Sequence, residues 1–333
     1  MYKLREVEDG DLEALYDLSK LQNFINLPSN KSELKKIIKT SKQSFTNPSE
    51  NLENNYYLFV LEIIENSKII GASMVHGKHG SEEKPHFYLK VSREHKFSQT
   101  LNTGFIHGTL KFNLEPNGWS EIGGLVLDPN YRGHELKLGK ALSFVRFLYI
   151  GLNKNKFTNK IHVELMPPLD KKGNSPLWEA IGRKFLNMEY QDADRLSQNN
   201  KEFILKLFPL DTIYETLLPM EARNAIGQVG ESTLPVKSML EKIGFHYTEE
   251  VDPFDGGPHY RAYTDEILPI KNICEAKVLI TNKIDEVSNF LILDDSENFC
   301  TTLVQGKIIN DELHLTDKYK QLTGKTISVL PLN

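Results

Sequence analysis

The chain has 333 residues, of which 39% are hydrophobic and 26% charged, and its formal net charge at pH 7 is −5. This length predicts two domains, and the hydrophobic content suffices for packed cores, which argues against a disordered chain. The net negative charge argues against binding to a nucleic-acid backbone, because neutralising phosphates requires an excess of Lys and Arg. Two cysteines far apart in the sequence, Cys274 and Cys300, argue against a disulfide framework and a cysteine zinc site, and no metal site is predicted.

The first eighteen residues mix charged and apolar side chains from the start, so a signal peptide is not expected. No uninterrupted apolar run is long enough to cross a bilayer. We therefore expect a soluble cytoplasmic protein without a membrane partner.

Alternating strand and helix patterns begin at the N-terminus. Strands are predicted at 2–7, 56–63 and 69–77. Asp11 and Ser29 are the candidate N-caps of the two helices between the first and second strands. For 78–120 we expect only short strands with loops.

The clearest local unit covers 121–151, where an apolar strand at 122–127 leads through a turn into a helix. A strand at 161–166 follows and closes a β-α-β unit. The later patterns predict helices starting at Pro176 and covering 199–207, 220–226 and 233–243, then a strand at 245–250 and a tight turn at 254–258. Beyond about 270 short strands and turns prevail, which indicates a small β-rich appendage.

The bend between the strand and the helix of 121–151 has the parts of a phosphate site. A helix N-terminus offers free backbone N–H groups and the positive end of its dipole, and glycine lets backbone approach a ligand closely. An acyl-CoA pyrophosphate would suit such a bend, and its pantetheine arm would pair with the strand edge. The candidate acyl-CoA residues are Leu125, Val126, Leu127, Arg132, Gly133, Lys137, Leu138, Gly139 and Lys140. The alternative is an ordinary strand–turn–helix with a solvated basic loop.

The segment LVLDPNYRGHELKLGKAL resembles the acyl-CoA motif of the GCN5-related acyltransferases, although Gly139 comes later than in that motif. A wider resemblance, over nearly the whole chain, is to the bacterial arginine N-succinyltransferase family. It rests on runs such as SPLWEAIG, IGQV and FDGGP in the family's order. It implies transfer of succinyl from succinyl-CoA to the α-amino group of arginine, in arginine catabolism.

The resemblance also implies a mixed α/β fold with two tandem GCN5-related halves. We place the acyl-CoA-binding half at 1–155, the half with the acceptor-site segments at 156–268, and the appendage at 269–333. Assembly into a homo- or hetero-oligomer is compatible with the family.

The resemblance places a catalytic histidine, the proton donor, directly after IGQV, where this chain has Gly230. Two further departures are Met166 in place of an arginine, and LQNFINLP in place of a glycine-rich run. Three candidates could supply the proton instead, namely His259, Glu231 and His162. For each of them a structural or surface role is the simpler interpretation, and catalysis by positioning and a water molecule is another.

An arginine acceptor carries a guanidinium group, which carboxylates bind as a fork. The substrate-binding candidates are Glu164, Asp255 and Ser175, with Asp192 and Asp194 as further acids in matching segments. Asp255 also fits a turn, and Ser175 fits the N-cap of the following helix.

Two functions from different classes follow. The first is a CoA-dependent N-acyltransferase acting on arginine or a related basic amine by direct attack on the thioester. The second is a catalytically impaired homologue or partner subunit that binds acyl-CoA in a regulatory role, which Gly230 favours. An RNA-modifying acetyltransferase is disfavoured by the acidic balance.

Overall fold

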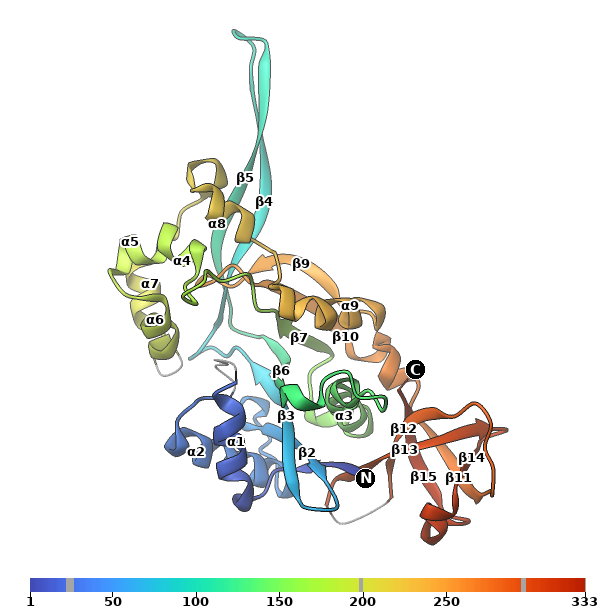
Figure 1. Cartoon of the computed structure of the whole chain (residues 1–333). Helices are drawn as coiled ribbons and strands as arrows, with labels where there is room; N and C mark the ends of the chain where they lie inside the picture. The colour runs from blue at the N-terminus through green and yellow to red at the C-terminus, as the bar shows by residue number, and fades with distance from the viewer. Residues whose placement is uncertain (22–26, 198–199, 295–297, 333) are drawn as a thin grey trace. The chain divides into compact units, whose positions relative to one another are not determined.

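The computed structural model describes residues 1–21, 27–197, 200–294 and 298–332. The chain forms two compact units, each assembled from separate segments (Figure 1). Unit 1 contains Met1–Lys78, Ser120–Asn159 and Tyr263–Asn333, and unit 2 contains His79–Trp119 and Lys160–Ala262. The division at 155 and 268 predicted above uses continuous segments and stays a prediction.

Unit 1 is built on a mixed sheet with strand order β12-β15-β11-β14-β13-β1-β2-β3-β6. Its N-terminal strands are β1 (Tyr2–Glu6), β2 (Tyr56–Ile63), β3 (Lys68–His79) and β6 (Trp119–Leu127). These strands agree closely with the apolar runs predicted at 2–7, 56–63, 69–77 and 122–127.

Helices cover both faces of β2, which is why this strand is apolar almost throughout. Leu58 and Val60 pack in one core cluster with residues of α1 (Leu12–Ser19) and α2 (Lys31–Thr46). On the opposite face the Tyr57 and Phe59 rings lie 5.0 and 5.5 Å from the ring of Tyr149 in α3 (Leu138–Leu152).

The predicted caps of the first two helices are partly wrong. Asn30, not Ser29, caps α2, since its side chain accepts hydrogen bonds from the backbone N–H groups of Ser32 and Glu33. Asp11 does precede α1, but its carboxylate accepts from the Glu8 N–H and from Arg5 and not from α1.

The C-terminal strands have a hydrophobic cluster of their own and are joined to the rest of unit 1 through β13. They are β11 (Cys274–Ile280), β12 (Ser288–Leu293), β13 (Cys300–Ile309), β14 (Glu312–Leu315) and β15 (Thr326–Pro331). Strand β13 pairs antiparallel with β1, with Tyr2 opposite Leu303. The two ends of the chain therefore share one sheet.

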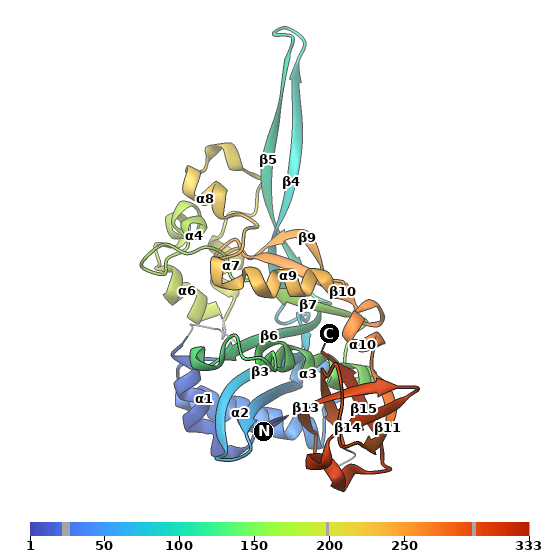
Figure 2. The ribbon, with the colours of Figure 1, turned by 45° about the vertical axis from the view of Figure 1, so that its right-hand side comes forward.

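Unit 2 has strand order β7-β10-β9-β4-β5-β8. Its strands are β4 (His86–Ser98), β5 (Thr103–Glu115), β7 (Lys160–Glu164), β8 (Ile213–Tyr214), β9 (His246–Val251) and β10 (Pro258–Tyr263). The expectation of short strands within 78–120 is wrong, because β4 and β5 pair along thirteen residues each. Figure 2 shows their far part as a two-stranded arm extending beyond α8 (Met220–Ala225) of the same unit.

Short helices complete unit 2, and most of them pack on the base of this hairpin. They are α4 (Pro176–Ala180), α5 (Gly182–Leu186), α6 (Tyr190–Ser197), α7 (Glu202–Leu207), α8 (Met220–Ala225) and α9 (Leu234–Lys242). Trp178 of α4 and Leu89 of β4 belong to one buried cluster with residues of α6 to α8. Among the described residues, no helix is both long and apolar enough to span a bilayer.

Candidate functional site

The predicted acyl-CoA segment lies in unit 1 and connects β6 to α3. Gly124, with φ 55°, and Gly133, with φ 72°, adopt the left-handed conformation that glycine accepts without strain. Lys137 is the N-cap of α3 at φ 54°, and its side chain forms no cap hydrogen bond. The first N–H groups of α3 therefore have no intrahelical partner, as at any helix start.

Side-chain exposure differs among the acyl-CoA candidates. Arg132 and Lys137 are exposed, and Lys140 is partly exposed with its ammonium 4.9 Å from the Phe144 ring. Val126 and Leu138 are buried in the core, so their side chains are not available to a ligand. Leu125, Leu127 and Gly139 are partly buried.

Unit 2 carries a group of carboxylates around the tight turn between β9 and β10. Asp252 accepts hydrogen bonds from the N–H groups of Phe254 and Asp255, and Asp255 accepts one from Gly257 N–H. A side chain at Gly257 would collide with the Leu165 carbonyl oxygen, 2.5 Å from the Cβ position. The turn predicted at 254–258 is confirmed, with the Asp255 carboxylate held in place.

Asp255 and Asp252 share their surroundings with Asp194 of α6. Removal from water, together with the neighbouring carboxylates, raises the pKa of Asp194 to about 7. The same two causes raise the pKa of Asp252, and burial is the main cause that raises the pKa of Asp255. The Tyr190 hydroxyl donates to Asp255 at 3.3 Å. A cationic ligand would relieve this accumulation of negative charge.

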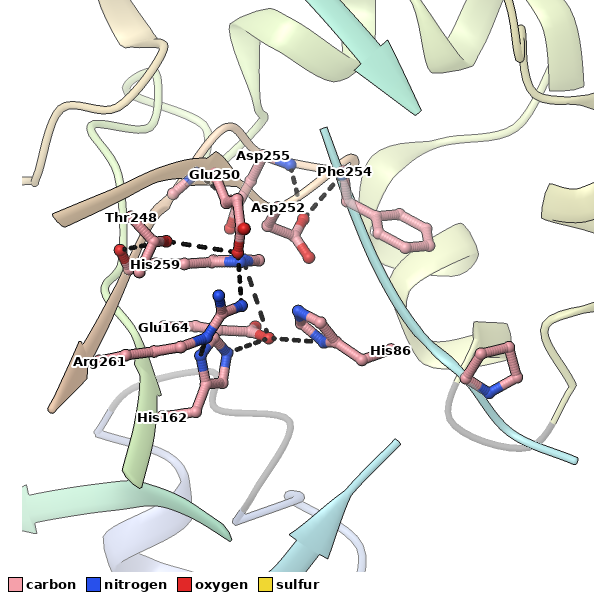
Figure 3. A network of polar contacts seen from close by, with 12 residues as sticks. His86, His162, Glu164, Thr248, Glu250, Asp252, Phe254, Asp255, His259 and Arg261 are labelled. Atoms are coloured by element: carbon pink, nitrogen blue, oxygen red, sulfur yellow. Dashed lines mark hydrogen bonds and ion pairs between the residues drawn. The ribbon is translucent and has the colours of Figure 1, made fainter. Parts of the chain in front are cut away.

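A second polar cluster lies on one face of the unit 2 sheet (Figure 3). Side chains two residues apart on a strand point to the same face, so β7 presents His162 and Glu164 together, and β10 presents His259 and Arg261. His86, at the start of β4, completes the group. Figure 3 shows the three imidazole rings around the Glu164 carboxylate.

Burial determines the protonation of His86 and His259. His86, His162 and His259 are all at most 2% exposed. Burial lowers the pKa of His86 well below its usual value and that of His259 to about 3, so both rings are neutral at physiological pH. Arg261 is ion-paired with Glu250, lies 3.4 Å from the Trp119 ring centroid, and donates from Nε to His162 Nδ1 at 3.2 Å.

The position after IGQV lies close to the end of β7. Gly230 donates its N–H to the Met166 carbonyl oxygen at 2.9 Å, so two of the departures predicted from the sequence are neighbours. Glu231 is exposed and begins a short 3-10 helix. The third predicted departure, LQNFINLP, includes 22–26, which lie outside the described residues.

Ser175 is fully buried and its hydroxyl has two structural contacts. It accepts from Trp178 N–H, which confirms the predicted helix cap, and donates to the Phe254 carbonyl oxygen at 2.9 Å. Through the second contact it anchors the turn that carries Asp255.

Sequence reasoning missed Asp252, Tyr190, His86 and Arg261, because no local motif connects residues that meet only in the folded sheet.

Comparison with known proteins decides the family. A family model described as the arginine N-succinyltransferase beta subunit matches residues 2–269, which is most of the chain. The chain belongs to this family. The resemblance seen in the sequence is thereby confirmed.

Curated relatives agree with this family. An arginine N-succinyltransferase of Yersinia enterocolitica is 35% identical over 322 residues, covering 95% of this chain and 92% of the relative. The arginine N-succinyltransferase subunit beta of Pseudomonas aeruginosa is 32% identical over 340 residues, covering 99% and 98%.

A solved structure of the family has the same fold. The arginine/ornithine succinyltransferase subunit AI from Pseudomonas aeruginosa covers 100% of this chain and 99% of its own, with a TM-score of 0.85 at 23% identity. At this identity the likeness concerns the fold alone, and it confirms the predicted α/β class.

Proposed function

We propose that this chain is a soluble cytoplasmic arginine N-succinyltransferase that uses succinyl-CoA as its acyl donor. The observation that carries the proposal is the family match over 2–269, supported by curated relatives of that name. A purely regulatory, non-catalytic role is not favoured by these relatives.

The acyl donor is assigned to the segment between β6 and α3. The start of α3 and the exposed cations Arg132 and Lys137 suit the CoA phosphates, with Gly133 allowing close approach and Lys140 adding charge. The backbone from Leu125 to Leu127 pairs with the pantetheine arm, while Leu138 and Gly139 offer backbone N–H groups.

The acceptor is assigned to the carboxylates of unit 2. Asp255 binds the guanidinium group, and Asp194 and Asp252 support it. These partly buried acids lie close together, and among the described residues no cationic side chain forms an ion pair with them. Ser175 positions Asp255 through Phe254.

The reaction needs no covalent enzyme intermediate. The neutral α-amine attacks the thioester carbonyl, the C–S bond breaks, and the amide nitrogen loses a proton while the CoA thiolate gains one. His259, neutral and buried, is not an imidazolium donor, and Glu231 is exposed. We therefore assign the proton transfers to water, with positioning as the main contribution of the protein.

We further propose that each unit contains one GCN5-related half and that 269–333 is an appendage of the first. The β6-α3 segment in unit 1 and the β7, β9 and β10 strands with α9 in unit 2 support this view.

A thiol-release assay tests the function, crossing succinyl-CoA and acetyl-CoA with arginine, ornithine and lysine. We expect release only when succinyl-CoA and arginine are both present, with succinylarginine as the product by mass spectrometry. Asp255→Asn should raise the KM for arginine at least tenfold and leave that for succinyl-CoA unchanged. Asp192→Asn is the matched control, since Asp192 is exposed on α6.

Absence of thiol release with every pair, in a folded protein that binds CoA, would contradict the assignment. Equal KM values for arginine in the Asp255 and Asp192 variants would remove the carboxylates as the acceptor site.

A further inference from the structure

The three histidines around Glu164 have no role in the acyl transfer proposed above. His86 Nδ1, His162 Nε2 and His259 Nε2 lie 3.6, 3.4 and 3.9 Å from Glu164 Oε1 (Figure 3). One nitrogen or oxygen from each of the four residues lies within 4.8 Å of all the others. Ligands around one tetrahedral zinc ion, with bonds of about 2.0–2.1 Å, are roughly 3.3 Å apart. A small contraction would therefore bring these atoms to metal-binding distance.

Three ring nitrogens of this cluster are left without hydrogen-bond partners in the described part of the chain. His86 Nε2 and both ring nitrogens of His259 are buried and have none among the described residues. Buried polar atoms without a partner are rare in folded proteins, because each loses its bonds to water and gains nothing in return. A neutral imidazole also presents a lone pair, which is the form that binds metal ions.

The third imidazole has a different environment. His162 Nδ1 accepts a hydrogen bond from Arg261 Nε, so Nδ1 carries no proton and Nε2, which faces Glu164, carries one. That proton blocks Nε2 as a ligand but lets His162 hold the Glu164 carboxylate in place, as hydrogen-bonding partners of metal ligands commonly do.

We propose that His86, His259 and Glu164 bind one divalent transition-metal ion of the zinc class, with His162 as a positioning residue for Glu164. Imidazole nitrogen with a single carboxylate favours such ions over Mg²⁺ and Ca²⁺, which prefer oxygen ligands. Three protein ligands leave one coordination position open. The sequence predicts no such site because its ligands come from β4, β7 and β10, which are far apart in the chain.

Metal binding is testable without the acyl-transfer assay. Tag-free protein is treated with a chelator, dialysed against Zn²⁺ and then against metal-free buffer, and its zinc content is measured by plasma mass spectrometry. We expect about one ion per chain, and a higher Tm with Zn²⁺ than after chelation. His86→Ala and His259→Ala should each weaken Zn²⁺ binding at least a hundredfold in titration calorimetry and abolish the Tm shift. His95→Ala, which removes an exposed histidine from the β4–β5 arm, should behave as the unaltered protein.

A zinc content of the unaltered protein that does not exceed background would overturn the proposal. The ring nitrogens without a partner would then be bonded to water. Equal zinc uptake by the His86 and His259 variants would do the same. If these variants fail to fold, the visible absorption spectrum of the unaltered protein loaded with Co²⁺ tests the site instead. Intense bands of low-coordinate Co²⁺ support the site, whereas the weak spectrum of the hydrated ion refutes it.

Discussion

At the scale of single residues, the position after IGQV is where the sequence predicts the main departure of this chain from its family motif. Gly230 has an ordinary φ of −63°, so its backbone conformation does not require glycine. A Cβ atom there would lie 3.1 Å from the Pro167 carbonyl oxygen, which a shift of a few tenths of an ångström relieves. The site can therefore accept a larger side chain with a small local adjustment.

Gly230→His should increase the kcat for succinyl transfer at least tenfold. A positioned general acid typically contributes about 10²–10⁴ in rate, and water replaces it only partly. Steady-state kinetics with saturating arginine and succinyl-CoA measures the change. Gly230→Ala, which adds the Cβ atom without a proton donor, is the control. A His variant no faster than the Ala variant would show that proton donation at this position does not limit the rate.

At the scale of elements, the apolar pattern predicted a strand well where packed helices cover its faces. Strand β2 matches its predicted bounds because helices cover both its faces and make it apolar throughout. The β4–β5 hairpin was missed for the opposite reason. Phe97, Phe105 and Ile106 of the arm are exposed, so no buried face imposes a regular alternation on that part of the sequence.

The cap of α2 gives a prediction at this scale. Asn30→Ala should lower the free energy of unfolding by about 1 kcal/mol, because two backbone N–H groups of the first helical turn lose their acceptor. Urea unfolding followed by circular dichroism measures the loss. Ser29→Ala, at the neighbouring position that the sequence favoured, should change stability by less than about half of that. Equal losses for the two variants would contradict the cap observed in the structure.

At the scale of the whole molecule, the carboxylates of unit 2 connect stability to pH. The pKa of Asp194 is about 7 in the folded protein, against about 3.9 for an unfolded Asp. Between these values the folded protein holds a proton that the unfolded chain releases, so stability falls as pH rises through this window and levels off above it.

Asp194→Asn should therefore flatten the pH dependence of stability. We expect the free energy of unfolding of the unaltered protein to decrease from pH 5 to pH 8, and that of the variant to decrease less. Urea unfolding at four pH values in this range measures both. Asp192→Asn, the exposed neighbour, should follow the unaltered protein. Parallel curves for the Asp194 variant and the unaltered protein would show that this carboxyl titrates normally.

The sequence by itself determined the family, the α/β class, most helices and strands, and the tight turn with Asp255. These features are local, since they depend on apolar periodicity, caps and short motifs such as FDGGP. Only the tertiary structure decided that Asp194, Asp252 and Asp255 form one group, and that His86, His162 and His259 surround Glu164. Strand pairing brings the histidines and Glu164 together from β4, β7 and β10, and the register of such non-local pairs is not encoded in any single segment.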